Sequence, residues 1–262
     1  MSNLISQIIK DLNGKKMLIP FFTAGYPALE SIVKLAIMAQ SCGCDMIELG
    51  MPFSDPLADG PEIQFSSKIA LDNGITVKTI LRQVSDIKAR IKTPIILMGY
   101  YNPLIAYGEE KFLRDASSAG VDGLIIPDLP VDESARFHQT ACVNNLSLTF
   151  LVSPTTTPER IKLIDRYSTN FVYAVTVTGV TGTGKVFDQK TDTYLKNMRL
   201  KLSKKFVAGF GVSSAESAKK LTTYADGVVI GSALIKILKN APAKKQGMAQ
   251  LETFLKKIRK AL

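Results

Sequence analysis

The chain has 262 residues, of which 46% are hydrophobic, and it carries a formal net charge of +10. This length and apolar content suffice for one large domain with a full core. No apolar run approaches the roughly 18 residues that a membrane span needs. The three cysteines (Cys42, Cys44 and Cys142) are too few for a disulfide framework, and with the single His138 they do not make a closed zinc site.

The chain opens with an amphipathic segment, residues 1–16, which predicts a short helix ended by Asn13-Gly14. This segment lacks the apolar core and cleavage site of a secretory signal, so we expect a cytoplasmic protein. Apolar strands then alternate with segments of helical spacing. The predicted strands are 17–23, 45–49, 94–100, 122–126, 146–152, 170–176, 205–209 and 226–230. The predicted helices are 29–40, 62–90 with a break at 73–74, 109–119, 132–143, one opening at Thr157-Pro158, 192–202, 213–221 and one from Ser232.

These segments form eight strand–helix units in order, with no change of composition that would mark a domain boundary. Apolar strands alternating with helices predict a parallel sheet that is covered by helices. Eight units in this length favour a closed (β/α)₈ TIM barrel over an open doubly wound sheet. We therefore predict an α/β protein with a single barrel domain over 1–262, an extra N-terminal helix, and a short extra helix after strand eight.

The stretch from Glu48 to Gln64 is the most informative part of the chain. Glu48 lies at the end of a predicted strand, and Asp59 follows at the far end of a loop stiffened by three prolines. A carboxyl group on the inner face of a buried strand has a raised pKa, which suits it to proton transfer. The alternative is a paired structural acid followed by an aspartate that caps a helix.

Glycines follow the last two predicted strands, where barrel enzymes bind phosphate. Strand seven ends in Gly209-Phe210-Gly211, and strand eight ends in Gly231-Ser232 before a short helix over 233–239. Glycine lets backbone N–H groups approach an anion, and a helix N-terminus favours negative charge. Either turn alone would be an ordinary tight connection. The presence of both in the expected places predicts a phosphate site.

The loop after strand six, 177–189, contains a near match to a nucleotide-binding P-loop. Val186 stands where that motif needs Ser or Thr for Mg²⁺, so we interpret the loop as a lid that closes over substrate. The basic charge could indicate nucleic-acid binding, but the lysines are spread over helical segments and are densest at residues 256–260. No stacking aromatics lie among them, so a phosphorylated substrate is favoured over nucleic acid.

Five motifs together resemble one family, the tryptophan synthase alpha subunit. They are the segments 20–27, 48–61, 179–182, 209–211 and 231–232. The resemblance covers essentially the whole chain. It implies a (β/α)₈ barrel that cleaves indole-3-glycerol phosphate to indole and glyceraldehyde 3-phosphate. It also implies no cofactor in this chain, and an αββα assembly with a beta subunit that carries pyridoxal phosphate and receives the indole.

The resemblance also assigns roles to residues. Glu48 and Asp59 match the two catalytic acids of the family. The implied phosphate-binding residues are Gly182, Gly211, Gly231 and Ser232. The implied indole pocket consists of Phe21, Ile63, Tyr100, Tyr173, Phe210 and Val229. The alternative for the aromatic residues, above all Phe21 and Tyr173, is that they only pack in the barrel core. Thr181 is expected to contact Asp59, and the loops that carry Pro52, Asp55, Pro56 and Asn102 are expected to face the beta subunit.

Besides nucleic-acid binding, two other readings of the chain remain open. Another phosphate-binding barrel enzyme, such as an indole-3-glycerol phosphate synthase or a phosphosugar isomerase, is the first. The synthase would need a catalytic lysine at a strand end, and the predicted strand ends offer none. The second is a subunit without activity of its own that only activates a beta partner. Loss of Glu48 or Asp59 would have favoured it, and both acids are present.

Overall fold

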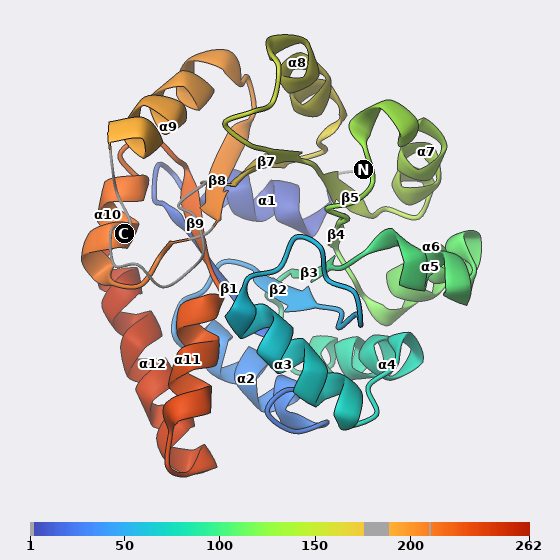
Figure 1. The fold of residues 1–262 in the computed structure, drawn as a ribbon, viewed down its shortest axis with the longest axis vertical. Helices are drawn as coiled ribbons and strands as arrows, with labels where there is room; N and C mark the ends of the chain where they lie inside the picture. The colour runs from blue at the N-terminus through green and yellow to red at the C-terminus, as the bar shows by residue number, and fades with distance from the viewer. Residues whose placement is uncertain (1–2, 176–188, 210) are drawn as a thin grey trace.

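The strands of the chain form one closed ring. The computed structural model describes residues 3–175, 189–209 and 211–262. Within them, all strands pair in parallel in the order β5-β4-β3-β2-β1-β9-β8-β7-β6, and Figure 1 shows them at the centre with most of the helices around them. Their bounds are β1 Met17–Thr23, β2 Ile47–Gly50, β3 Ile95–Met98, β4 Gly123–Ile125, β5 Ser147–Thr149, β6 Leu151–Val152, β7 Phe171–Val175, β8 Lys205–Gly209 and β9 Gly227–Ile230.

The ring closes through Phe150, which separates β5 from β6. The sequence predicts one strand over 146–152, whereas the structure divides this segment between two neighbours. Its first half pairs with β4 and its second half with β7. The Tyr173 amide donates to the Phe150 carbonyl at 3.0 Å, and the Phe150 amide donates to Ser168 Oγ at 3.2 Å. The nine strands are therefore the eight of a (β/α)₈ barrel, with the fifth counted twice.

Helices surround this ring on the outside, as the alternation predicts (Figure 1). Thr157 and Thr76 cap α8 and α4 with their side chains, and Pro158 occupies the first turn of α8. The outer helices are α2 Ser31–Ser41, α3 Pro61–Asp72, α4 Val77–Lys88, α5 Tyr101–Tyr107, α6 Glu109–Ala119, η1 Val131–Glu133, α7 Ala135–Val143, α8 Pro158–Tyr167, α9 Gln189–Lys201, α10 Ala215–Leu221, α11 Ser232–Asn240 and α12 Lys244–Ala261. The short α11 is the predicted extra helix after strand eight. No helix in the described part of the chain is long and apolar enough to cross a membrane.

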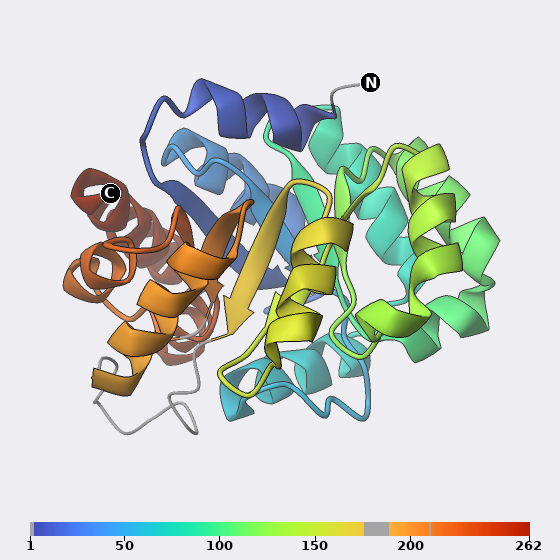
Figure 2. The same cartoon turned by 90° about the horizontal axis from the view of Figure 1, so that it is seen from above.

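The predicted N-terminal helix is α1, Leu4–Asp11, and it lies across the end of the barrel where the strands begin (Figure 2). Ile5, which belongs to this helix, is fully buried. Beside this apolar contact, the Asn3 amide donates to Ser147 Oγ at 2.6 Å, and the Asn170 amide donates to Asn3 Oδ1 at 3.1 Å. The helix therefore seals the amino end of the barrel, opposite the end where active sites of this fold are built.

Acidic residues fasten the strands at this amino end. Each follows a helix, and its carboxylate accepts a hydrogen bond from the first backbone amides of the neighbouring strand and pairs with a cation. The pairs are Asp45 with Leu18 and Arg259, Asp122 with Ile95 and Lys88, and Asp226 with Phe206 and Arg199. These hydrogen bonds and ion pairs stabilise the amino end of the ring, and none of them involves the opposite end, where the strands finish.

The position of Asn102 corrects one prediction. The sequence analysis places Asn102-Pro103 in a loop, but both residues belong to α5. Proline is tolerated there because it lies in the first turn, where its missing N–H would have had no partner within the helix. Asp128 supplies a cap from a different segment: its carboxylate accepts from the Tyr101 amide at 2.9 Å. The helix start thus depends on a contact that is distant in sequence.

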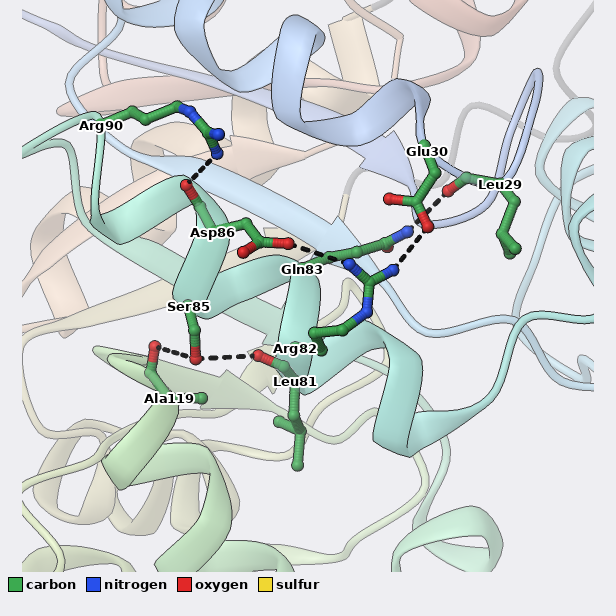
Figure 3. A network of polar contacts seen from close by, with 9 residues as sticks. All are labelled: Leu29, Glu30, Leu81, Arg82, Gln83, Ser85, Asp86, Arg90 and Ala119. Atoms are coloured by element: carbon green, nitrogen blue, oxygen red, sulfur yellow. Dashed lines mark hydrogen bonds and ion pairs between the residues drawn. The ribbon is translucent and has the colours of Figure 1, made fainter.

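The outer helix α4 is anchored to its neighbours by the polar contacts in Figure 3. Arg82 pairs with Glu30 and with Asp86, but these side chains are largely exposed and such pairs contribute little. Gln83 is different because it is fully buried. Its amide donates to the Leu29 carbonyl at 2.6 Å, which ties α4 to the segment that leads into α2.

Candidate active site

A cavity opens at the carboxyl end of the barrel. Glu48 lines it from within β2, and Asp59 lines it from the loop that leads into α3. The other predicted site residues on its wall are Phe21, Ile63, Tyr173, Gly211, Val229, Gly231 and Ser232. These residues thus bring six separate segments of the chain together at one place. Thr181, Gly182 and Phe210 lie outside the described residues.

Glu48 is the most perturbed acid on the cavity wall. Its side chain is 1% exposed, and neither carboxyl oxygen has a hydrogen-bond partner among the described residues. Burial, together with the negative charge of Asp59, raises the pKa of Glu48 to about 8. Because the neutral form is preferred in such surroundings, Glu48 carries a proton at pH 7 and can donate it to a bound molecule.

Asp59 has a different environment from that of Glu48. Burial raises its pKa to about 6, while a hydrogen bond from the Tyr100 hydroxyl lowers the pKa and so favours the charged form. The same hydroxyl accepts from the Ala58 amide at 2.8 Å, and this fixes the loop beside Asp59. At pH 7 the two acids therefore differ in charge: Asp59 is an anion and Glu48 is neutral. Two acids whose pKa values differ in this way can take different catalytic roles.

Tyr100 lies behind Asp59 rather than on the wall of the main cavity. It lines a small adjoining cavity whose wall also includes Phe21, Asp59 and Ile63. The ring of Phe53 packs against it with centroids 5.4 Å apart. Tyr100 therefore joins the loop after β2 to the end of β3 and holds Asp59 in place.

Two glycines make room for the aromatic rings of the site. A Cβ atom at Gly50 would lie 2.4 Å from the Phe21 ring, and one at Gly209 would lie 2.3 Å from the Tyr173 hydroxyl. Both rings are buried as well as lining the cavity. Phe21 and Tyr173 therefore belong both to the barrel core and to the wall of the pocket, which the sequence analysis treats as alternatives. Burial and the nearby acids raise the pKa of Tyr173 well above its ordinary value, so its hydroxyl stays protonated.

The two glycine-rich turns differ in what they offer an anion. Ser217 Oγ accepts from the Ser213 and Ser214 amides at 3.1 and 3.0 Å, so the turn before α10 satisfies its own N–H groups. Gly231, the N-cap residue of α11, makes no side-chain cap. Gly231 and Ser232 line the cavity, so this helix start, which has no side-chain cap, is available to a bound anion.

Gly211 lies on the wall of the same cavity as Gly231 and Ser232. Its φ angle is +85°, a conformation that residues with a Cβ atom rarely adopt. Gly60, Glu62, Met98 and Val212 also line the cavity and were missed by the sequence analysis. Gly60 and Glu62 stand inside the stretch already singled out, and Met98 lies within the predicted strand 94–100. Proximity to these features is the signal that could have found them.

The loop after β2 is prominent on the surface. Asp55 is exposed, and Pro52 and Pro56 are partly exposed. Leu57 is 93% exposed, and Ile105 on α5 is 55% exposed. Large apolar side chains at such exposure are typical of contact surfaces when they gather beside one another in a functional region. Leu57 and Ile105 were not predicted, because their exposure is set by tertiary structure.

The fold and the cavity define the class: this is a (β/α)₈-barrel enzyme with its site at the carboxyl ends of the strands. A family model described as "Tryptophan synthase alpha chain" matches residues 9–262. The alpha chain of Pelodictyon phaeoclathratiforme is 43% identical over 266 residues, which cover 98% of this chain and 99% of that protein. That of Geobacter sulfurreducens is 41% identical over 250 residues, which cover 95% and 94%.

Solved structures of this family have the same fold. The alpha chain of Legionella pneumophila superposes with a TM-score of 0.92 at 33% identity, covering 100% of this chain and 97% of that one. An alpha subunit from the Pyrococcus furiosus a2b2 complex gives 0.86 at 36% identity, covering 93% and 98%. The chain belongs to the tryptophan synthase alpha chain family. It is a lyase of tryptophan biosynthesis, and its reaction is the cleavage of indole-3-glycerol phosphate.

Proposed function

We propose that Glu48 and Asp59 carry out this cleavage as a retro-aldol reaction. The observation that carries the proposal is the pair of acids in one cavity, one neutral and one charged at pH 7. Breaking a carbon–carbon bond needs an acceptor for the bonding electrons. An indole ring protonated at C3 becomes that acceptor, because the positive charge then extends to the ring nitrogen.

In this mechanism Glu48 acts first as a general acid and then as a base. It donates its proton to C3 of the indole ring and becomes a carboxylate. That carboxylate takes the proton of the glycerol hydroxyl next to the breaking bond. As the hydroxyl oxygen forms a carbonyl, the C–C electrons return to the ring and neutralise its charge. Indole and glyceraldehyde 3-phosphate leave, and Glu48 again holds a proton.

Asp59 stabilises the charge that develops during the first step. As an anion it accepts a hydrogen bond from the indole N–H, and this bond strengthens as positive charge reaches the nitrogen. Tyr100 orients Asp59 for this contact through the loop that they share. Phe21, Tyr173, Ile63 and Val229 provide the apolar walls for the ring.

The phosphate group is bound at the opposite wall, by Gly211, Gly231 and Ser232, and we extend this site to Gly182. The support is the uncapped start of α11 on the cavity wall. The aromatic end and the phosphate end of the substrate are then held from different strands. Such two-ended binding fixes the reacting carbon against Glu48.

The rate should depend on pH in a way that follows from the two acids. Asp59 must be charged, so kcat/KM should rise as pH increases through about 6. Glu48 must be protonated, so kcat/KM should fall as pH increases through about 8. A bell-shaped profile of kcat/KM for indole release is the expected result, with both limbs belonging to the coupled pair.

The Asp59→Asn variant provides the control for this profile. Its residual activity should lose the acid limb, because the group that titrates there is gone. Its alkaline limb should move to lower pH, because the charge that helps raise the pKa of Glu48 is gone as well. A wild-type profile that is flat from about pH 5 to 9 would contradict the assignment of both acids.

We further propose that the chain acts as one domain, 1–262, in an αββα assembly in the cytoplasm. The partner would be a beta subunit that holds pyridoxal phosphate, while this chain needs no cofactor of its own. Exposed Leu57 and Ile105, with Pro52, Asp55, Pro56 and Asn102, support a contact surface at the loop after β2 and at α5.

The test of this function is indole release from indole-3-glycerol phosphate, measured with and without a cognate beta subunit. We expect slow release by the chain alone and a rise of about tenfold or more with the partner, the scale of a typical coupling free energy. Release that is unaffected by the partner would leave a lyase acting alone. A folded chain that releases no indole in either case would be a non-catalytic activator, and the proposed mechanism would be wrong.

A further inference from the structure

The helix that follows Asp59 and the helix that begins at Ser232 are joined by charged side chains. Lys236 Nζ of α11 lies 3.2 Å from Glu62 Oε1 of α3. Three residues further along α11, Lys239 Nζ lies 4.0 Å from the centre of the Phe65 ring of α3. The Glu62 side chain is 15% exposed, against 45% for Lys236. The acid is therefore the more buried member of the pair.

The position of Glu62 is unexpected for a site that receives a phosphate. Glu62 lines the same cavity as Gly211, Gly231 and Ser232. A carboxylate in the first turn of α3 interacts well with the helix dipole, which gives it a local reason to be there. It also adds negative charge to the wall of a cavity that must bind an anion. Like charges in a partly enclosed site repel strongly unless a cation offsets one of them.

We propose that Lys236 is a positioning residue for phosphate binding, acting through Glu62. By pairing with the Glu62 carboxylate it draws that group toward α11 and offsets its charge, so that the cavity accepts a dianionic phosphate. Lys236 lies one turn beyond Ser232 on the same helix, so the pair also fixes the start of α11 against the start of α3. This inference rests on the proposed phosphate site.

The first test is the variant Lys236→Met, which keeps the length and apolar stem of the side chain. Glu62 would then lie on the cavity wall without the positive charge of Lys236 beside it. We expect KM for indole-3-glycerol phosphate to rise roughly tenfold with kcat changed by less than about twofold, as for a charge several ångströms away at an effective dielectric constant near 20. The rise should shrink at about 1 M salt, because ions screen the repulsion. A rise that is independent of salt would indicate a loosened helix contact instead.

The second test is the double variant Glu62→Gln/Lys236→Met. If Lys236 acts by offsetting charge, removal of both charges should return KM to within about twofold of the wild-type value. If the pair only holds the helices together, the double variant should be no better than Lys236→Met, and the inference is overturned. Lys239→Met is the matched control: it breaks the neighbouring contact of the same two helices and should leave KM unchanged.

Inorganic phosphate separates failure of this inference from failure of the phosphate site itself. For the wild type it should inhibit indole release competitively, and Lys236→Met should weaken that inhibition by the same factor that raises KM. If phosphate does not compete in the wild type, the proposed phosphate site is wrong. If phosphate competes equally well in the wild type and in Lys236→Met, only the role of Lys236 is wrong.

Discussion

Glu48→Gln should lower kcat for indole release by about three orders of magnitude or more, within the range typical of a lost general acid–base. Glutamine has nearly the same shape as glutamic acid, but it has no proton to give to C3 and cannot remove one from the hydroxyl. KM should change little, because the ring and phosphate contacts remain. Steady-state kinetics of purified protein would measure this, and activity within about tenfold of wild type would refute the assignment.

The same substitution should make the fold more stable. The pKa of Glu48 is about 8 in the folded chain and about 4.3 in an unfolded one. A raised pKa means that the stabilisation due to Glu48 is fully present below about pH 4 and is lost as pH rises toward 8. Glu48→Gln removes this loss. Its free energy of unfolding should exceed that of the wild type by a few kcal/mol at pH 8, and the difference should vanish near pH 4.

Chemical denaturation at several pH values would measure this difference. Glu216→Gln is a suitable control, since Glu216 is an exposed acid on α10, and it should alter neither turnover nor the dependence of stability on pH. If Glu48→Gln were less stable than the wild type at every pH, the carboxyl would have a stabilising partner, and the absence of one among the described residues would be misleading.

Gly211→Asp should raise KM for indole-3-glycerol phosphate about 100-fold, because it places a carboxylate within a few ångströms of the phosphate. Gly211 lies on the cavity wall, and its φ angle of +85° also disfavours any side chain. Part of the effect of an aspartate would thus come from backbone strain. The part due to charge can be isolated by comparison.

Gly211→Asn provides that comparison, because asparagine has the size of aspartate, tolerates this backbone conformation and carries no charge. We expect KM to rise only a few-fold in this variant, and inorganic phosphate to inhibit it nearly as well as the wild type. Equal KM values for the two variants would mean that strain alone is responsible. The phosphate would then bind elsewhere in the cavity.

Much of the barrel and the position of the paired acids could be predicted from the sequence, because both depend on local patterns. The strand Met17–Thr23 and the helix Glu109–Ala119 are confirmed with their predicted bounds, since apolar periodicity and glycine turns define them. The segment from Glu48 to Asp59 contains the end of a predicted strand, the stiff loop and both acids within one short stretch of sequence. Its place at the carboxyl end of the barrel follows from topology.

Features that depend on distant contacts could not be predicted. The start of α5 is capped by Asp128, the fifth strand divides at Phe150 between two neighbours, and Lys236 reaches Glu62 across two helices. No spacing of residues in the sequence predicts these contacts. Tyr100 shows the same limit at the site: its residue type suggests a pocket wall, whereas only the folded loop shows that its hydroxyl holds Ala58 and Asp59.

The pairing of β1 with β9 has a consequence for how the molecule stays folded. Other neighbours in the ring follow one another along the chain, but here Met17 pairs with Gly227, so the first strand meets the last. This junction requires closure of by far the longest loop of chain. The cavity straddles it, with Phe21 and Glu48 on one side and Val229 and Gly231 on the other. A substrate bound in this cavity would therefore contact both the first strands and the last strand of the chain. The site is complete only when β1 and β9 are paired.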